Sequence, residues 1–162
     1  MKLTLISFFL TCVLLTSCTK SSNLTAPITP PCNPNNNSAR TVDGFAPSMS
    51  SFQTSIDNNS NDYWVGGYNN NGVDMHILCK FNPVQDGVYE TGNDNNGKGE
   101  INVTYLERSN TRSVSWQSLV GEKVYFQTTA DGKRIITLCY HAIRDQSSGS
   151  LSHIDAKLTT PY

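Results

Sequence analysis

From about Phe45 onward the chain shows short segments in which apolar and polar residues alternate, and this alternation constrains the fold more than any other feature of the chain. A period of two places the apolar side chains on one face of an extended strand. No window of useful length shows the 3.6-residue period of an amphipathic helix. The alternation predicts strands over residues 51–56, 63–68, 74–81, 88–91, 100–106, 114–119, 122–130, 133–144 and 152–159.

Turn residues separate these predicted strands. Asp131-Gly132 lies between two long apolar runs, and an Asn-rich turn ending at Gly72 joins the second and third strands. Asn, Asp and Gly accept the positive φ that tight hairpins need. The pattern predicts an all-β fold, either an antiparallel β-sandwich or a small β-barrel of about 7–9 strands. Three apolar faces are predicted, namely Met75, Ile77, Cys79 and Phe81, then Ile101, Val103 and Tyr105, and last Ile154, Ala156 and Leu158.

The first residues have the layout of a bacterial lipoprotein signal peptide. Lys2 precedes an apolar stretch that ends in Leu15-Thr16-Ser17-Cys18. A run of about 13 apolar residues is too short for a membrane span, which needs roughly 20. We therefore expect residues 1–17 to be removed and the Cys18 thiol to carry a lipid anchor that includes palmitate. A secretory signal cut after a small residue is the alternative.

Residues 18–44 are predicted to be the lipidated cysteine and a flexible tether. Four of the seven prolines fall in this segment, beside a run of asparagines. Such a composition cannot bury a core. Residues 45–162 then form a single all-β domain, since the length suits one domain.

Charge excludes one class of partner. The chain has 12 Lys and Arg against 13 Asp and Glu, a formal net charge of −1. Nucleic-acid binding needs clustered cations, and the closest approach to a cluster, Lys133-Arg134, flanks a turn. We therefore expect no nucleic-acid partner. The expected partner is the membrane, bound through the acyl chains on Cys18.

The cysteines allow one internal disulfide. Of the five, Cys12 leaves with the signal and Cys18 is lipidated, so Cys32, Cys79 and Cys139 remain in an oxidising compartment. Cys79 and Cys139 both fall in predicted strands, which makes them the candidate pair, with two free buried thiols as the alternative. Cys32 lies in the predicted tether and is expected to be unpaired.

The chain resembles small Bacteroidetes-type β-rich lipoproteins of uncharacterised function. The resemblance rests on the signal ending in Cys18, the polar tether, and the segments 121–126, 131–136 and 154–158. It implies a strand, a turn, a long strand and a last strand in that order, and location at the outer membrane, on the periplasmic face or the cell surface. It implies no catalytic residue. Acidic residues often follow the lipidated cysteine in surface-exposed members and are missing after Cys18, which slightly favours the periplasmic face.

No pattern identifies a catalytic residue, a metal site or a cofactor. The candidate zinc ligands are scattered, because Cys79 and His76 fall on opposite faces of one strand while Cys139 and His141 are predicted to share a face. The Asn/Asp loops at 57–62 and 93–97 lack the spacing of a calcium loop. Nucleophile motifs are also missing. We therefore do not expect an enzyme.

Aromatic residues carry the functional expectation. Tyr63, Trp64 and Tyr68 flank an Asn-rich turn and are candidate ligand contacts, since sugars stack on aromatic rings and protein partners use them as anchors. For Trp64 and Trp116 a place in the core is the favoured alternative. We expect a binding or accessory module with a glycan or an envelope protein as ligand. The alternatives are a structural envelope component and a hydrolase with an unrecognised site.

Overall fold

The computed structural model describes residues 28–42, 53–58, 62–68, 72–80, 84–93, 97, 99–108 and 113–160. Cys18, Phe81 and the rest of the chain lie outside the described residues. Within them the fold is all-β, as predicted, and no helix is long and apolar enough to cross a membrane. The strands are β1 (Ser38–Thr41), β2 (Gln53–Asn58), β3 (Tyr63–Tyr68), β4 (Val73–Cys79), β5 (Gly87–Glu90), β6 (Ile101–Arg108), β7 (Ser113–Ser118), β8 (Lys123–Thr128), β9 (Arg134–Asp145) and β10 (Leu151–Thr160).

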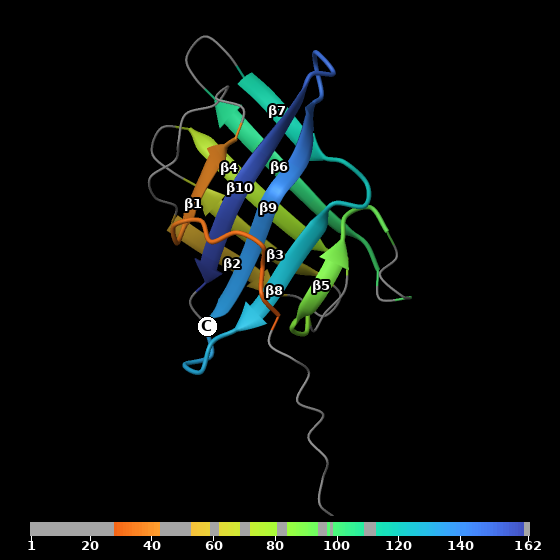
Figure 1. Ribbon diagram of the computed structural model, residues 1–162. Coiled ribbons are helices and arrows are strands. Elements are labelled where there is room, and N and C mark those ends of the chain that lie inside the picture. Colours follow the sequence, from red (N-terminus) through yellow and green to blue (C-terminus); the bar gives the residue numbers. More distant parts are fainter. Residues whose placement is uncertain are drawn as a thin grey trace, which may run out of the picture.

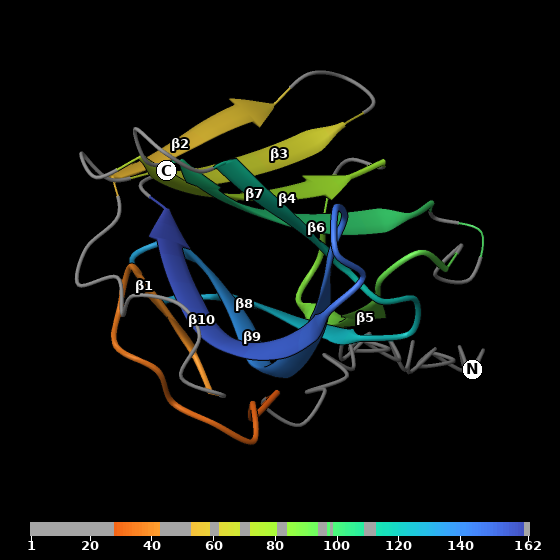
Figure 2. The same ribbon diagram turned by 90° about the horizontal axis from the view of Figure 1, so that it is seen from above.

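The strands form one curled antiparallel sheet. Its order is β1-β10-β9-β7-β6-β4-β3-β2, while β8 pairs with both β9 and β5. Figure 2 shows that the curl creates two facing layers, with β2, β3, β4, β6 and β7 in one and β1, β10, β9, β8 and β5 in the other. On the open side of the curl β2 approaches β10. The result lies between the predicted sandwich and the predicted barrel.

The inward faces of the two layers form one apolar core. The predicted faces on β4, β6 and β10 are confirmed, and Trp116 packs against the core as expected. A period of two produces this burial because alternate residues of a half-buried strand point to opposite sides. Side chains that are at most 2% exposed include Val65, Met75, Ile77, Ile101, Val103, Tyr105, Val124, Phe126, Ile136, Leu138, Ile154 and Leu158.

β9 changes partner along its length. Residues 134–138 pair with β8, and residues 143–145 pair with β7. Between these two stretches Cys139 and Tyr140 lie opposite the single residue Asp155, which makes a β-bulge. The bulge reverses the alternation, so that Cys139 points outward while His141 points inward and is fully buried. The prediction that Cys139 and His141 share a face is therefore wrong.

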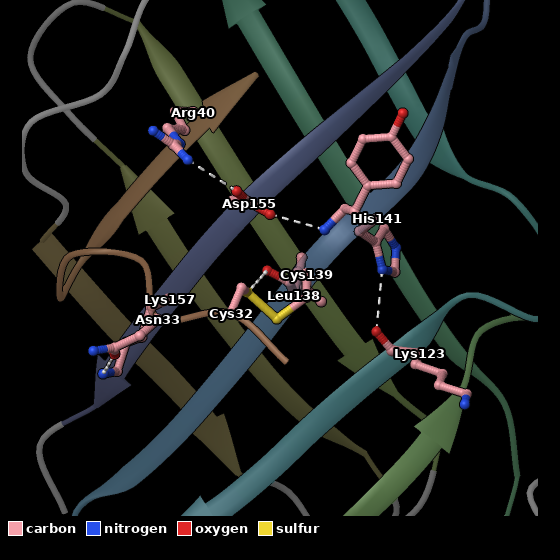
Figure 3. The surroundings of a disulfide bond; sticks show 10 residues. Cys32, Asn33, Arg40, Lys123, Leu138, Cys139, His141, Asp155 and Lys157 are labelled. Atoms are coloured by element: carbon pink, nitrogen blue, oxygen red, sulfur yellow. Dashed lines mark hydrogen bonds and ion pairs between the residues drawn. A yellow bond between two sulfur atoms is a disulfide. The ribbon is translucent and has the colours of Figure 1, made fainter. Parts of the chain in front are cut away.

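The predicted disulfide is also wrong. Cys139 is bonded to Cys32, and Cys79 is a free thiol buried in the core. Because Cys79 points into the core from β4 and Cys139 points out of β9, the two sulfurs lie on opposite sides of the second layer. Figure 3 shows the disulfide on the outside of β9, where the Cys32 sulfur also packs 3.6 Å from the Leu138 carbonyl oxygen.

The N-terminal part of the domain begins earlier than predicted. Residues 28–42 cross the outer face of β8, β9 and β10 (Figure 1) and end in β1, which extends the sheet beside β10. Hydrogen bonds hold this segment, with Gln127 Nε2 donating to the Ile28 carbonyl at 2.5 Å and the Thr159 N–H donating to Asn37 Oδ1 at 2.7 Å. The predicted tether of 18–44 is therefore too long, and a domain start at residue 45 is wrong.

Candidate binding face

The outer surface of the first layer carries aromatic side chains over β3 and β4. Tyr63 and Val65 point into the core, so Trp64, Gly66 and Tyr68 lie on the opposite side of β3. We call the outer surface formed by Trp64, Gly66 and Tyr68 with the neighbouring Asp74 and His76 of β4 the β3–β4 face. It is the place where the candidate contacts predicted from sequence can meet a ligand.

Gly66 allows the indole of Trp64 to lie flat on the sheet. A Cβ atom at Gly66 would collide with ring atoms Cη2, Cζ2 and Cζ3 of Trp64. Any residue other than glycine would therefore push the indole off its own strand. The Trp-Val-Gly-Gly-Tyr run of β3 thus fixes the orientation of one aromatic plane at the surface.

β4 supplies the neighbours of this indole. His76 lies opposite Gly66 in the sheet, and its ring centroid is 5.2 Å from that of Trp64 at an interplanar angle of 56°. Tyr68, 42% exposed, lies opposite Asp74. On the other side of His76, β6 places Thr104. Leu78 lies opposite Trp64 itself, and Leu106 lies opposite Asp74, so both polar and apolar side chains lie around the aromatic plane.

This arrangement suits a ligand with both apolar and hydroxyl groups. The face of an aromatic ring packs against C–H groups, while neighbouring carboxylate, hydroxyl and imidazole groups exchange hydrogen bonds. A pyranose ring presents these two kinds of group on different sides. The β3–β4 face can bind such a ring.

The three predicted ligand contacts lie on different sides of β3. Tyr63 is only 7% exposed and packs edge-on against Phe126, with ring centroids 6.5 Å apart, so its assignment as a ligand contact is wrong. Trp64 and Tyr68 are on the outer face, and the expectation that Trp64 is in the core is wrong as well. Sequence reasoning missed Gly66 and His76. Strict alternation from the apolar Val65 would have placed Trp64 and Gly66 together on the outside.

Tyr63 belongs to a cluster of polar side chains around Arg134; burial raises the pKa of Tyr63, and the charge and hydrogen bond of Arg134 partly offset this. Arg134 Nη1 pairs with Asp86 Oδ1 at 2.9 Å, and Arg134 Nη2 donates to the Val84 carbonyl at 2.6 Å. Burial raises the pKa of Cys79 to about 12, and the nearby Arg134 only partly offsets this. The thiol therefore stays protonated and is a poor nucleophile. We interpret this cluster as structural.

The histidines do not converge. His76 lies on the outer side of β4, His141 points into the core from β9, and His153 lies on the outer side of β10. In the part of the chain that the structure describes, no group of three or more His, Cys, Asp or Glu side chains could hold a metal ion.

Comparisons with known proteins give no relative. No family model matches the chain, no curated protein matches it, and no solved structure matches its fold.

Proposed function

We propose that this protein is a lipid-anchored binding module of the cell envelope, held at the outer membrane through Cys18, and that its β3–β4 face binds a glycan. The observation that carries the proposal is the Trp64 indole, which Gly66 keeps flat on the outside of the sheet. An indole in this position covers its own strand and not the core. A ring fixed before binding loses little conformational entropy when a ligand arrives.

The Cys32–Cys139 disulfide supports the envelope location. Disulfides persist in oxidising compartments outside the cytoplasm and are rare inside it. The lipoprotein pattern ending at Cys18 leads to the same location by a separate argument. Both the periplasmic face and the cell surface agree with these two features.

A glycan fits the β3–β4 face better than a protein partner does. Among the described residues of this face, Tyr68, at 42%, is the one large hydrophobic side chain that is well exposed. Protein interfaces usually have a broader apolar centre. An aromatic plane with Asp74, His76 and Thr104 on one side suits a small polyhydroxylated ligand instead.

The test is a glycan array with the mature chain solubilised in detergent. We expect Trp64→Ala to lower the affinity for any bound glycan by about tenfold, since an aromatic contact contributes about 0.5–1.5 kcal/mol. Gly66→Ala should also weaken binding, because it displaces the ring without removing it. Val88→Ala, at a 48% exposed position of β5, is the matched control and should bind normally. Equal binding by wild type and Trp64→Ala would refute the assignment.

An envelope protein remains the second candidate ligand because of β2. This strand ends the sheet, and among the described strands only β3 pairs with it. Open strand edges recruit other chains by adding a strand. A protein captured by such pairing should bind the Trp64→Ala variant and the wild type with equal affinity. A glycan should bind the variant more weakly, and this difference separates the two candidate ligands.

A further inference from the structure

Tyr140 has the features of a contact residue, although it lies far from the β3–β4 face in the fold. It sits in the β9 bulge on the outer side of the second layer, and its side chain is 58% exposed. Its φ is +45°, in the left-handed region that residues with a Cβ avoid. Asn37 is the only other non-glycine residue with a positive φ in the part of the chain that the structure describes. A strained and exposed aromatic residue suggests a functional site.

Three interactions hold Tyr140 in this conformation. The preceding residue, Cys139, is bonded to Cys32. The Tyr140 N–H donates to Asp155 Oδ1 at 2.8 Å. The phenol ring stacks on His153, with centroids 4.1 Å apart and an interplanar angle of 11°. One face of the phenol is therefore supported, and the ring is fixed before any ligand binds.

The strands around Tyr140 carry cations without ionic partners. Register places Arg144 opposite the exposed Leu151 at one end of the outer surface, and Lys157 opposite Ser38 at the other. Among the described residues, neither Arg144 nor Lys157 makes an ion pair, although Lys157 Nζ donates to Asn33 Oδ1 at 3.1 Å. From residue 151 to residue 157 a strand spans about 20 Å.

The carboxylates near this surface are already engaged. Asp155 accepts the Tyr140 N–H and also pairs with Arg40 at 3.3 Å, as the dashed lines at Asp155 in Figure 3 show. Glu122 Oε2 accepts the Ala142 N–H at 3.1 Å from the neighbouring loop. Asp145, next to Arg144 along β9, accepts from Ser147 and Ser148. Arg144 and Lys157 are therefore the two described cations near Tyr140 that no carboxylate pairs with.

We propose that Tyr140, His153, Arg144 and Lys157 form a second binding surface, which takes an acidic polysaccharide whose sugar rings carry carboxylates. A sugar ring packs on the free face of the Tyr140 phenol, and the carboxylates pair with Arg144 and Lys157. The spacing of the two cations suits an extended chain of several rings. This surface does not depend on the β3–β4 face, so either site can fail alone.

Polygalacturonate is the probe, and its fully methyl-esterified form is the neutral control with the same backbone. With the mature chain in detergent, we expect binding to polygalacturonate that weakens several-fold as salt is added, and no binding to the ester. Arg144→Gln should reduce both affinity and salt dependence. Trp64→Ala should bind as wild type does. Equal binding of both polymers, or binding to anionic lipid vesicles and not to polygalacturonate, would overturn the proposal.

The decisive variant is Tyr140→Asn. Asparagine accepts a left-handed backbone, so the substitution relieves strain while it removes the ring. We expect about tenfold weaker binding with a thermal midpoint that is unchanged or higher. If Tyr140 were only structural, the midpoint would fall and the affinity of the folded protein would stay the same. That result would contradict the proposal.

Discussion

At the scale of single residues, His141 has the most unusual environment. Its Nδ1 lies 3.3 Å from the Lys123 carbonyl oxygen, which can only accept, so Nδ1 carries the proton. Figure 3 shows this contact between β9 and β8. Nε2 is buried and has no hydrogen-bond partner among the described residues. Burial lowers the pKa of His141, and the Lys123 carbonyl and the Glu122 carboxylate only partly oppose this. The folded protein therefore holds a neutral imidazole.

This environment predicts acid sensitivity. Below the ordinary pKa of 6.5 the unfolded chain binds a proton at His141 and the folded chain does not, so stability falls as pH decreases. The loss approaches 1.36 kcal/mol per pH unit for one proton. We expect His141→Phe to reduce the difference in urea-unfolding free energy between about pH 7 and about pH 5. An identical pH dependence in wild type and variant would contradict the assignment.

At the scale of elements, sequence patterns located most strands but not their partners. β3 matches its predicted range of 63–68, and the Asp131-Gly132 hairpin is present, with Gly132 at a φ of 85°. These features depend on residues that are close together in the sequence, so the alternation and the turn residues are enough to predict them. β1 was missed because Ser38–Thr41 has one inward apolar residue, Ala39, and depends on pairing with β10. The bulge at Tyr140 was missed because no residue type in an alternating strand marks the position at which an extra residue is inserted.

The same limit explains the missed disulfide. Cys32 lies in a proline-rich and asparagine-rich segment that buries little, so composition alone predicts a free tether. Its attachment depends on contacts with residues more than 90 positions away, including Gln127, Cys139 and Thr159. Of the candidate contacts, Tyr68 lies on the outer side of β3 as alternation suggests, whereas Trp64 was expected in the core and Gly66 and His76 beside its indole were not predicted at all.

Removing the disulfide should destabilise the whole domain. The cysteines are 107 residues apart, and closing a loop of about 100 residues is worth up to about 4.7 kcal/mol by chain entropy. We expect Cys32→Ser to lose about 2–5 kcal/mol in urea unfolding, and Cys139→Ser to lose the same amount. Non-reducing peptide mapping should link Cys32 to Cys139 in wild type and in Cys79→Ala. A peptide that links Cys79 to Cys139 would contradict the structure.

At the scale of the whole molecule, the proposed lipid anchor on Cys18 gives the attachment of residues 28–42 a consequence, because the disulfide and hydrogen bonds of this segment would then limit how far the domain lies from a membrane. If residues 19–44 were free, the domain could stand far from the bilayer. Because Ile28 is already held by Gln127 of β8, only residues 19–27 lie between Cys18 and the domain, which makes ten Cα–Cα steps from Cys18 to Ile28. A fully extended chain of that length spans about 35 Å.

The point of attachment also orients the domain. Gln127 pairs with Ile135 near the β8–β9 turn, whereas the β9–β10 turn lies at the other end of β9 (Figure 1). A strand of 12 residues is about 40 Å long. We therefore expect the β8–β9 turn to lie nearer the membrane, with the β9–β10 turn farther away and open to partners.

Neutron reflectometry on a supported bilayer that contains the mature lipoprotein tests this short tether. The gap between the headgroups and the protein layer should be at most about 35 Å, since the ten Cα–Cα steps from Cys18 to Ile28 cannot extend farther. A variant with a long Gly/Ser insertion between Lys20 and Ser21 is the matched control and should raise the layer, because flexible linkers lengthen with residue number. A wider gap in wild type, or no response to the insertion, would mean that the domain is not held through Cys18 and Ile28.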